Sequence, residues 1–258
     1  TLRAHRDAEI HQDILEGMGD IHIESVVSKL KTKYGVNVKT VEAKIPYRET
    51  ISGTAKAQGR LKRQTGGKGQ FGDCWLELQP LQRGEGFSFE NKVVGGSIPK
   101  NFIPAIEKGV RETLVEGYVA GFPVVDVRAI VYDGSYHDVD SSEQAFKTAA
   151  KLAFHNAAEK ANPVLLEPVM NITIDIPDDA VGDVMGDLNT RRAQTQGMEP
   201  VTTGITRIQA QVPMAHIARY AIDLRSMTKG RGRFATDFSH YAEVPGDVAT
   251  AIREAYQA

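Results

Sequence analysis

The sequence has very little cysteine and no long run of apolar residues. Its 258 residues include one cysteine, Cys74, so no disulfide can form within the chain, as is typical of proteins from a reducing compartment. We interpret Cys74 as a small core residue. No segment approaches the roughly 20 apolar residues of a membrane-spanning helix, and the N-terminal stretch TLRAHRDAEI lacks a signal-peptide pattern. We therefore predict a cytoplasmic protein without a membrane segment.

The sequence also lacks an excess of one charge. Its 31 Lys and Arg and 33 Asp and Glu give a formal net charge of −2. Such a chain cannot coat nucleic acid with its whole surface, so any RNA contact must come from local patches. The length allows two or three domains. The first residue is not Met and lies within a predicted strand, so we expect a fragment of a longer protein.

A nucleotide-binding motif is missing, although residues 67–72, GKGQFG, match the dinucleotide pattern G-x-G-x-x-G. That pattern binds a pyrophosphate only where it leaves a strand and opens a helix. Here CWLEL follows, which predicts a strand. The phosphate-loop motif is also absent, because Lys68 is followed by Gly69 rather than Ser or Thr. We therefore predict a hairpin loop and no nucleotide site.

Helix and strand patterns follow one order at both ends of the chain. In the last third, the predicted elements are a strand at 171–176, a helix at 178–189, strands near 191–199 and 205–212, a helix at 213–227 and a strand at 233–241. This β-α-β-β-α-β order is the split βαβ arrangement of ferredoxin-like domains. The first 45 residues match its last four elements, with predicted strands at 1–9 and 12–17, a helix at 20–34 and a strand at 36–41.

The middle of the chain has a different pattern. Strands dominate 46–95, and an amphipathic helix is predicted over 101–116. A buried strand at 124–132 and a polar loop at 133–140 precede a helix from 142 to 161. Ser141 and Gln144 have capping-box spacing at the start of that helix. The fold class is therefore α+β with several domains, and we place boundaries near residues 45 and 166.

A basic stretch surrounds the glycine loop. No acidic residue interrupts it between 55 and 70. It is either an ordinary solvated face or a contact for an RNA backbone. Its cations are Lys56, Arg60, Lys62, Arg63 and Lys68.

Two further polar segments are candidate sites. His137 with Asp138 and Asp140 could form an acid/base pair or half a metal site, but no second His stands at ligand spacing and the pattern lacks the glycine of a calcium loop. We favour a recognition tip for RNA base edges and 2′-hydroxyls. In TKGRGRF, turn chemistry explains the glycines but not the three cations Lys229, Arg231 and Arg233.

Five segments resemble bacterial elongation factor G, in order along the whole chain. They are EGMGDIHIE (16–24), YRETI (47–51), QTGGKGQFG (64–72), DGSYHDVDSSEQAF (133–146) and LRSMTKGRGRF (224–234). The resemblance implies two ferredoxin-like units flanking a ribosomal-protein-S5-like α+β domain with a left-handed crossover. The implied division is partial domain III without its first strand and helix (1–45), domain IV (46–165), domain V (166–246) and a C-terminal helix (247–258).

The resemblance also implies a mechanical role. Two loops form the tip of domain IV, which enters the small-subunit decoding centre, promotes tRNA–mRNA movement and opposes slippage back. The implied partners are both ribosomal subunits with their RNA and the tRNA–mRNA complex, and domain V approaches large-subunit RNA with its three cations. The tip residues carried over are Gly66, Gly67, Lys68, Gly69 and Gln70 in one loop and His137, Asp138 and Val139 in the other.

In this reading the chain is a monomer that is no enzyme and holds no cofactor. GTP and magnesium belong to the missing N-terminal domain of a ribosome-stimulated GTPase. Lys68 and Phe71 stand where the family often has Arg and Tyr, so the parent could be the housekeeping factor, a recycling-specialised paralogue or a relative with altered GTPase activity. Two other classes remain open: an enzyme using His137 and Asp138, and a stand-alone ribosome- or RNA-binding module.

Overall fold

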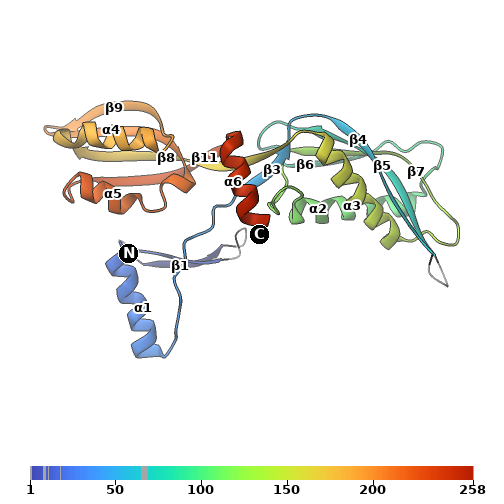
Figure 1. The fold of residues 1–258 in the computed structure, drawn as a ribbon, viewed down its shortest axis with the longest axis horizontal. Coiled ribbons are helices and arrows are strands. Elements are labelled where there is room, and N and C mark those ends of the chain that lie inside the picture. The colour runs from blue at the N-terminus through green and yellow to red at the C-terminus, as the bar shows by residue number, and fades with distance from the viewer. Residues whose placement is uncertain (1, 8–9, 11, 18, 65–68, 258) are drawn as a thin grey trace. The chain divides into compact units, whose positions relative to one another are not determined.

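The chain divides into two compact units, and Figure 1 shows the fold of the described residues. The computed structural model describes residues 2–7, 10, 12–17, 19–64 and 69–257. Unit 1 combines Thr1–Pro46 with Glu167–Ala242, and unit 2 combines Tyr47–Leu166 with Glu243–Ala258. The domain limits predicted from the sequence at 45, 165 and 246 stay predictions. No helix among the described residues is long and apolar enough to span a membrane.

The larger part of unit 1 is ferredoxin-like. Its strand order is β11-β8-β10-β9, so the fourth strand of the domain lies beside the first, then the third, then the second. Alternate residues such as Ile174 and Ile208 face the helix residues Val184 and Leu224 in one core. This arrangement confirms the β-α-β-β-α-β prediction. The elements are β8 (Pro163–Pro177), α4 (Val181–Thr190), β9 (Gln194–Thr202), β10 (Ile205–Pro213), α5 (Tyr220–Met227) and β11 (Arg233–Glu243).

Two predicted helices in this domain begin later than expected. The helix predicted from 213 is wrong over its first half, because β10 continues through Pro213 and a 3₁₀ turn (η3, Met214–His216) follows it. Bonds from Ile217 N–H to the Met214 carbonyl and from Tyr220 N–H to the Ile217 carbonyl close tight turns before α5 begins. Similarly, a 3₁₀ turn (η2, Asp178–Ala180) precedes α4.

The described residues among the first 46 form two paired strands and a helix. Strand β1 (Arg3–Asp7) pairs antiparallel with β2 (Gln12–Glu16), and α1 (Asp20–Tyr34) has the predicted bounds. Gly35 ends α1 in the left-handed conformation, with φ of 68°. The strand predicted at 36–41 is wrong. Its alternating valines favour extended backbone, but the segment pairs with no strand of the described chain, and ladder bonds need a neighbour.

Unit 2 is built on a four-stranded sheet with two helices on one face. The strand order is β4-β5-β7-β6, antiparallel except for β6 and β7, which run parallel and are joined through α2. Buried Leu76 and Val131 of the sheet share one core with Ile106 and Phe146 of the helices. A short strand pairs antiparallel with the start of β8. The elements are β3 (Arg48–Ile51), β4 (Ala55–Arg63), β5 (Gln70–Pro80), β6 (Phe87–Asn91), η1 (Lys100–Phe102), α2 (Ile103–Glu116), β7 (Val127–Ser135), α3 (Glu143–Lys160) and α6 (Gly246–Gln257).

The β4–β5 hairpin lies directly against the backbone of α3. A Cβ atom added at Gly59 would stand 2.0 Å from the Ala149 carbonyl oxygen and 2.2 Å from the Ala153 nitrogen. One added at Gly72 would stand 2.5 Å from the Ala145 carbonyl oxygen. The alanines recur every four residues and are fully or almost fully buried, so small side chains on α3 meet glycines on the hairpin. No other residue type fits between these two backbones.

Glu49 of β3 is fully buried and organises the loop after α2. Its carboxylate accepts four backbone N–H groups, from Tyr118 (2.7 Å), Val119 (3.0 Å), Ala120 (2.7 Å) and Phe122 (3.1 Å). Hydrogen bonds to an ionised acceptor are stronger than neutral ones, and several of them compensate the loss of water around a buried charge. The loop is therefore held by a side chain about 70 residues earlier in the chain.

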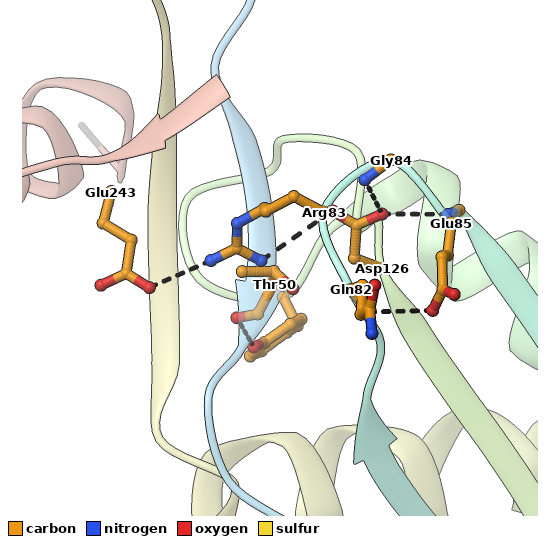
Figure 2. A network of polar contacts seen from close by, with 9 residues as sticks. Thr50, Gln82, Arg83, Gly84, Glu85, Asp126 and Glu243 are labelled. Atoms are coloured by element: carbon orange, nitrogen blue, oxygen red, sulfur yellow. Dashed lines mark hydrogen bonds and ion pairs between the residues drawn. The ribbon is translucent and has the colours of Figure 1, made fainter. Parts of the chain in front are cut away.

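A second buried carboxylate holds the loop between β5 and β6 (Figure 2). Asp126 has a left-handed backbone, with φ of 58°, and accepts the N–H groups of Gly84 (3.0 Å) and Gly86 (2.9 Å). Arg83 approaches Asp126 at 3.9 Å and pairs with Glu243 at 3.0 Å. Since Glu243 is followed by α6, this network ties the C-terminal segment to unit 2.

Replacement of Gly59 by Ala should destabilise unit 2. The new methyl group would overlap the α3 backbone, which can yield only by moving the helix, and we expect a loss of at least about 1–3 kcal/mol in the free energy of unfolding. Urea titration followed by fluorescence of Trp75, the only tryptophan, reports on this unit. Gly246→Ala is the matched control, because a Cβ there meets nothing within 4 Å. Equal midpoints for the two variants would refute the close packing of hairpin and helix.

Candidate nucleic-acid interface

The described end of the glycine loop lies at the start of β5. Gly69 is buried and Gln70 is exposed, while Gly66, Gly67 and Lys68 lie outside the described residues. Strand β5 begins at Gln70. The glycine pattern therefore opens onto a strand, as predicted, and offers no helix N-terminus to a pyrophosphate.

The second predicted loop is a closed turn between β7 and α3. The His137 N–H donates to Ser141 Oγ, and the Ser141 N–H donates to the His137 carbonyl oxygen, both at 3.0 Å. His137 and Asp138 are exposed, and Val139 keeps 72% of its surface accessible. The turn thus presents three consecutive side chains to solvent.

The capping box predicted at Ser141 is wrong by one residue. The N-cap of α3 is Ser142, whose Oγ accepts the Ala145 N–H at 3.2 Å. The hydroxyl of Ser141 is already engaged by His137 in the turn. Sequence spacing alone does not separate two adjacent serines that are both able to cap.

The structure brings the two loops together through Asp140 and Phe71. Asp140 Oδ1 accepts the Gly69 N–H at 3.0 Å, and its carbonyl oxygen accepts the Phe71 N–H at 2.9 Å. The His137 ring packs against Phe71 with centroids 4.2 Å apart. Sequence reasoning gave neither Phe71 nor Asp140 a place in the tip. Asp140 drew attention only as a metal or acid/base candidate.

A buried carboxylate supports this end of the sheet. Asp73 of β5 accepts Ser135 Oγ at 2.6 Å from β7 and Gln58 Nε2 at 2.8 Å from β4. Asp73 therefore joins the adjacent strands β4, β5 and β7 close to the two loops. These bonds fix the strand ends from which both loops depart.

The cations of the basic stretch differ in their surroundings. Lys56 pairs with Glu77 at 3.0 Å, and this hydrogen bond raises the Lys56 pKa above its usual value. The Arg60 guanidinium lies over the Phe71 ring at 5.4 Å. Lys62 and Arg63 are exposed and form no ion pair with another described residue. The end of β4 nearest the loops therefore carries the cations that are available to an anionic partner.

The cations of TKGRGRF lie beside carboxylates of their own domain. Arg231 contacts Asp179 at 2.8 Å, and Arg233 contacts Asp175 at 3.0 Å. Asp175 also binds Arg207 at 2.7 Å, and the two guanidinium groups, Arg207 first, lower the Asp175 pKa. Lys229 is exposed in a left-handed backbone conformation with φ of 53°. These arginines are partly neutralised before any partner approaches.

The surroundings of His137 are those of an open surface. No group of three or more His, Cys, Asp and Glu in the described part of the chain is placed to hold a metal ion. A groove of about 810 Å³ lies instead among β1, β2, α1 and residues 38–43, and none of the predicted site residues lines it. Acid/base catalysis on a substrate needs a pocket around the reacting groups, whereas His137 and Asp138 are exposed on the described turn.

Comparison with known proteins assigns the family. Three family models match consecutive parts of the chain: "Elongation Factor G, domain III" at residues 1–42, "Elongation factor G, domain IV" at 43–162 and "Elongation factor G C-terminus" at 164–252. A crystal structure of a protein from Thermus thermophilus is similar, with 42% sequence identity and a TM-score of 0.85. That match covers 99% of this chain but only 38% of the other, so the chain spans less than two fifths of that relative's length. The chain belongs to the elongation factor G family, of which it carries domain III, domain IV and C-terminal sequence.

Proposed function

We propose that this chain is the C-terminal portion of a ribosomal translocase. In this proposal the tip of domain IV enters the decoding centre of the small subunit as the tRNA–mRNA duplex leaves the A site. By binding the advanced state better than the earlier one, the tip favours movement and opposes slippage back. The tip consists of Gly66–Gln70 and His137–Val139.

The observation that carries this proposal is the joining of two loops into one exposed end of unit 2. The Asp140–Gly69 and His137–Phe71 contacts hold the loops together, and His137, Asp138 and Val139 face solvent. Exposed imidazole and carboxylate groups supply donors and acceptors for base edges and 2′-hydroxyls. Lys62 and Arg63 lie behind the tip along β4, where they suit a phosphate backbone.

The remaining parts of the proposal concern partners and compartment. The partners are both ribosomal subunits and the tRNA–mRNA complex, met by a monomer in the cytoplasm. Lys229 is the cation of domain V best suited to large-subunit RNA, since Arg231 and Arg233 contact Asp179 and Asp175. This chain itself holds no cofactor and is no enzyme. GTP and magnesium bind in another domain of the longer protein, which hydrolyses GTP on the ribosome.

His137→Ala in the longer protein should slow tRNA–mRNA movement and leave ribosome-stimulated GTP hydrolysis near normal. Losing one hydrogen bond of about 0.5–1.5 kcal/mol that forms only in the advanced state slows the step about twofold to tenfold. His137→Phe is the matched control for packing, because it keeps a ring against Phe71 and removes the ring nitrogens. Both activities are measured on one preparation of each variant. If His137→Phe moves tRNA at the normal rate, the imidazole makes no functional contact.

Replacing Lys62 and Arg63 together by Gln should weaken binding of this chain to small ribosomal subunits and flatten its dependence on salt. Each phosphate contact adds roughly 0.7–0.9 to the slope of log affinity against log salt, so the slope should fall by about one to two. The control is Lys160→Gln, an exposed cation in the last turn of α3, which should leave the slope unchanged. An identical slope for the double variant and the parent chain would exclude this stretch from the RNA contact.

A further inference from the structure

The Asp140 side chain and the Gly69 backbone fit each other closely. Oδ1 of Asp140 accepts the Gly69 N–H at 3.0 Å across 71 positions of sequence. A Cβ added at Gly69 would lie 2.9 Å from the carboxyl carbon and 2.9 Å and 3.0 Å from the two oxygens. The carboxylate therefore occupies the space that any side chain at position 69 would need. A side chain at position 69 would have to displace the Asp140 carboxylate.

The main chain and the side chain of Asp140 make separate contacts. Its carbonyl oxygen accepts the Phe71 N–H, within a parallel bridge between Phe71 and Ser141. Its carboxylate reaches two residues further back, to Gly69. The backbone contact fastens the start of β5, whereas the side-chain contact fastens the end of the glycine loop. Only the second contact is lost when the side chain alone is shortened.

The side chain of Asp140 is less accessible to RNA than the exposed side chains of His137, Asp138 and Val139. Asp140 is half-buried, and its Oδ1 points to Gly69. Because Asp140 is less exposed than His137–Val139, it is better placed to hold the glycine loop than to contact RNA directly.

We propose that Asp140 is the positioning residue of the domain IV tip. Its carboxylate fixes the end of the glycine loop relative to His137, and Gly69 supplies the room for that contact. The inference deepens the proposed function and rests on it for the claim that this geometry serves RNA binding. Asp140 acts on RNA only through the loop that it holds.

The test compares three variants of the 258-residue chain by amide hydrogen exchange and NMR. In Asp140→Ala, the Gly69 amide should exchange at least about tenfold faster and lose its hydrogen-bonded proton shift, while the Phe71 amide keeps its protection because its acceptor is backbone. Asp140→Asn keeps an oxygen acceptor and should restore most of the Gly69 protection. Asp138→Ala removes an equal charge from the exposed part of the turn and should leave Gly69 unchanged. Unaltered Gly69 exchange in Asp140→Ala would overturn the inference.

Binding of Asp140→Ala and Asp140→Asn to small ribosomal subunits separates this inference from the proposed function. We expect Asp140→Ala to bind at least about threefold more weakly, because an untethered loop must be ordered on binding, and Asp140→Asn to bind nearly as well as the parent chain. Faster Gly69 exchange with unchanged affinity in Asp140→Ala would support the positioning role of Asp140 and count against a tip that contacts RNA. Unchanged Gly69 exchange with weaker binding would contradict the positioning role of Asp140 and leave the proposal of an RNA-contacting tip intact.

Discussion

The contact between the β4–β5 hairpin and α3 determines how the exposed end of unit 2 is built. Gly59 and Gly72 let the hairpin backbone touch the helix backbone at Ala149 and Ala145, a separation that no side chain permits. Because α3 begins just after the His137–Ser141 turn, the same contact fixes where both loops depart. The tip that we propose would push on another molecule and would need such backing, since close-packed backbones transmit force with little deformation.

Buried carboxylates are the second recurring device in this unit. Glu49, Asp73 and Asp126 keep 0%, 6% and 3% of their surface exposed and accept hydrogen bonds from backbone or side-chain donors of distant segments. A charge without water requires several donors, so each of these residues holds segments that are distant in sequence in one arrangement. Asp140 applies the same chemistry at the surface, where it holds the glycine loop. Unit 2 therefore holds its loops and strand ends by carboxylate acceptors as well as by apolar packing.

Local patterns predicted the elements well and the contacts between them poorly. The helix 20–34 and the β-α-β-β-α-β order follow from periodicity, and the strand after the glycine pattern follows from CWLEL. The segment 36–41 fails because alternation selects extended backbone but not a neighbour to pair with. The contacts of Glu49 and Asp140 were not predicted, because their carboxylates accept from backbone N–H groups about 70 residues away. Backbone N–H groups carry no sequence signature. The family resemblance supplied the two loops that we propose as the tip, whereas the structure shows the contacts that join their described residues.

The decisive experiment is to find which RNA lies next to the tip. The one native thiol is unsuited to labelling, since burial raises the pKa of Cys74 to about 12 and leaves it inaccessible. Val139→Cys, at a position with 72% of its surface exposed, therefore takes a single iron chelate for hydroxyl-radical probing on small ribosomal subunits. Lys160→Cys, labelled in the same way in the last turn of α3, is the control. We expect cleavage from position 139 to be confined to decoding-centre RNA and to be absent from position 160. Cleavage elsewhere, or the same pattern from both positions, would contradict a tip that enters the decoding centre.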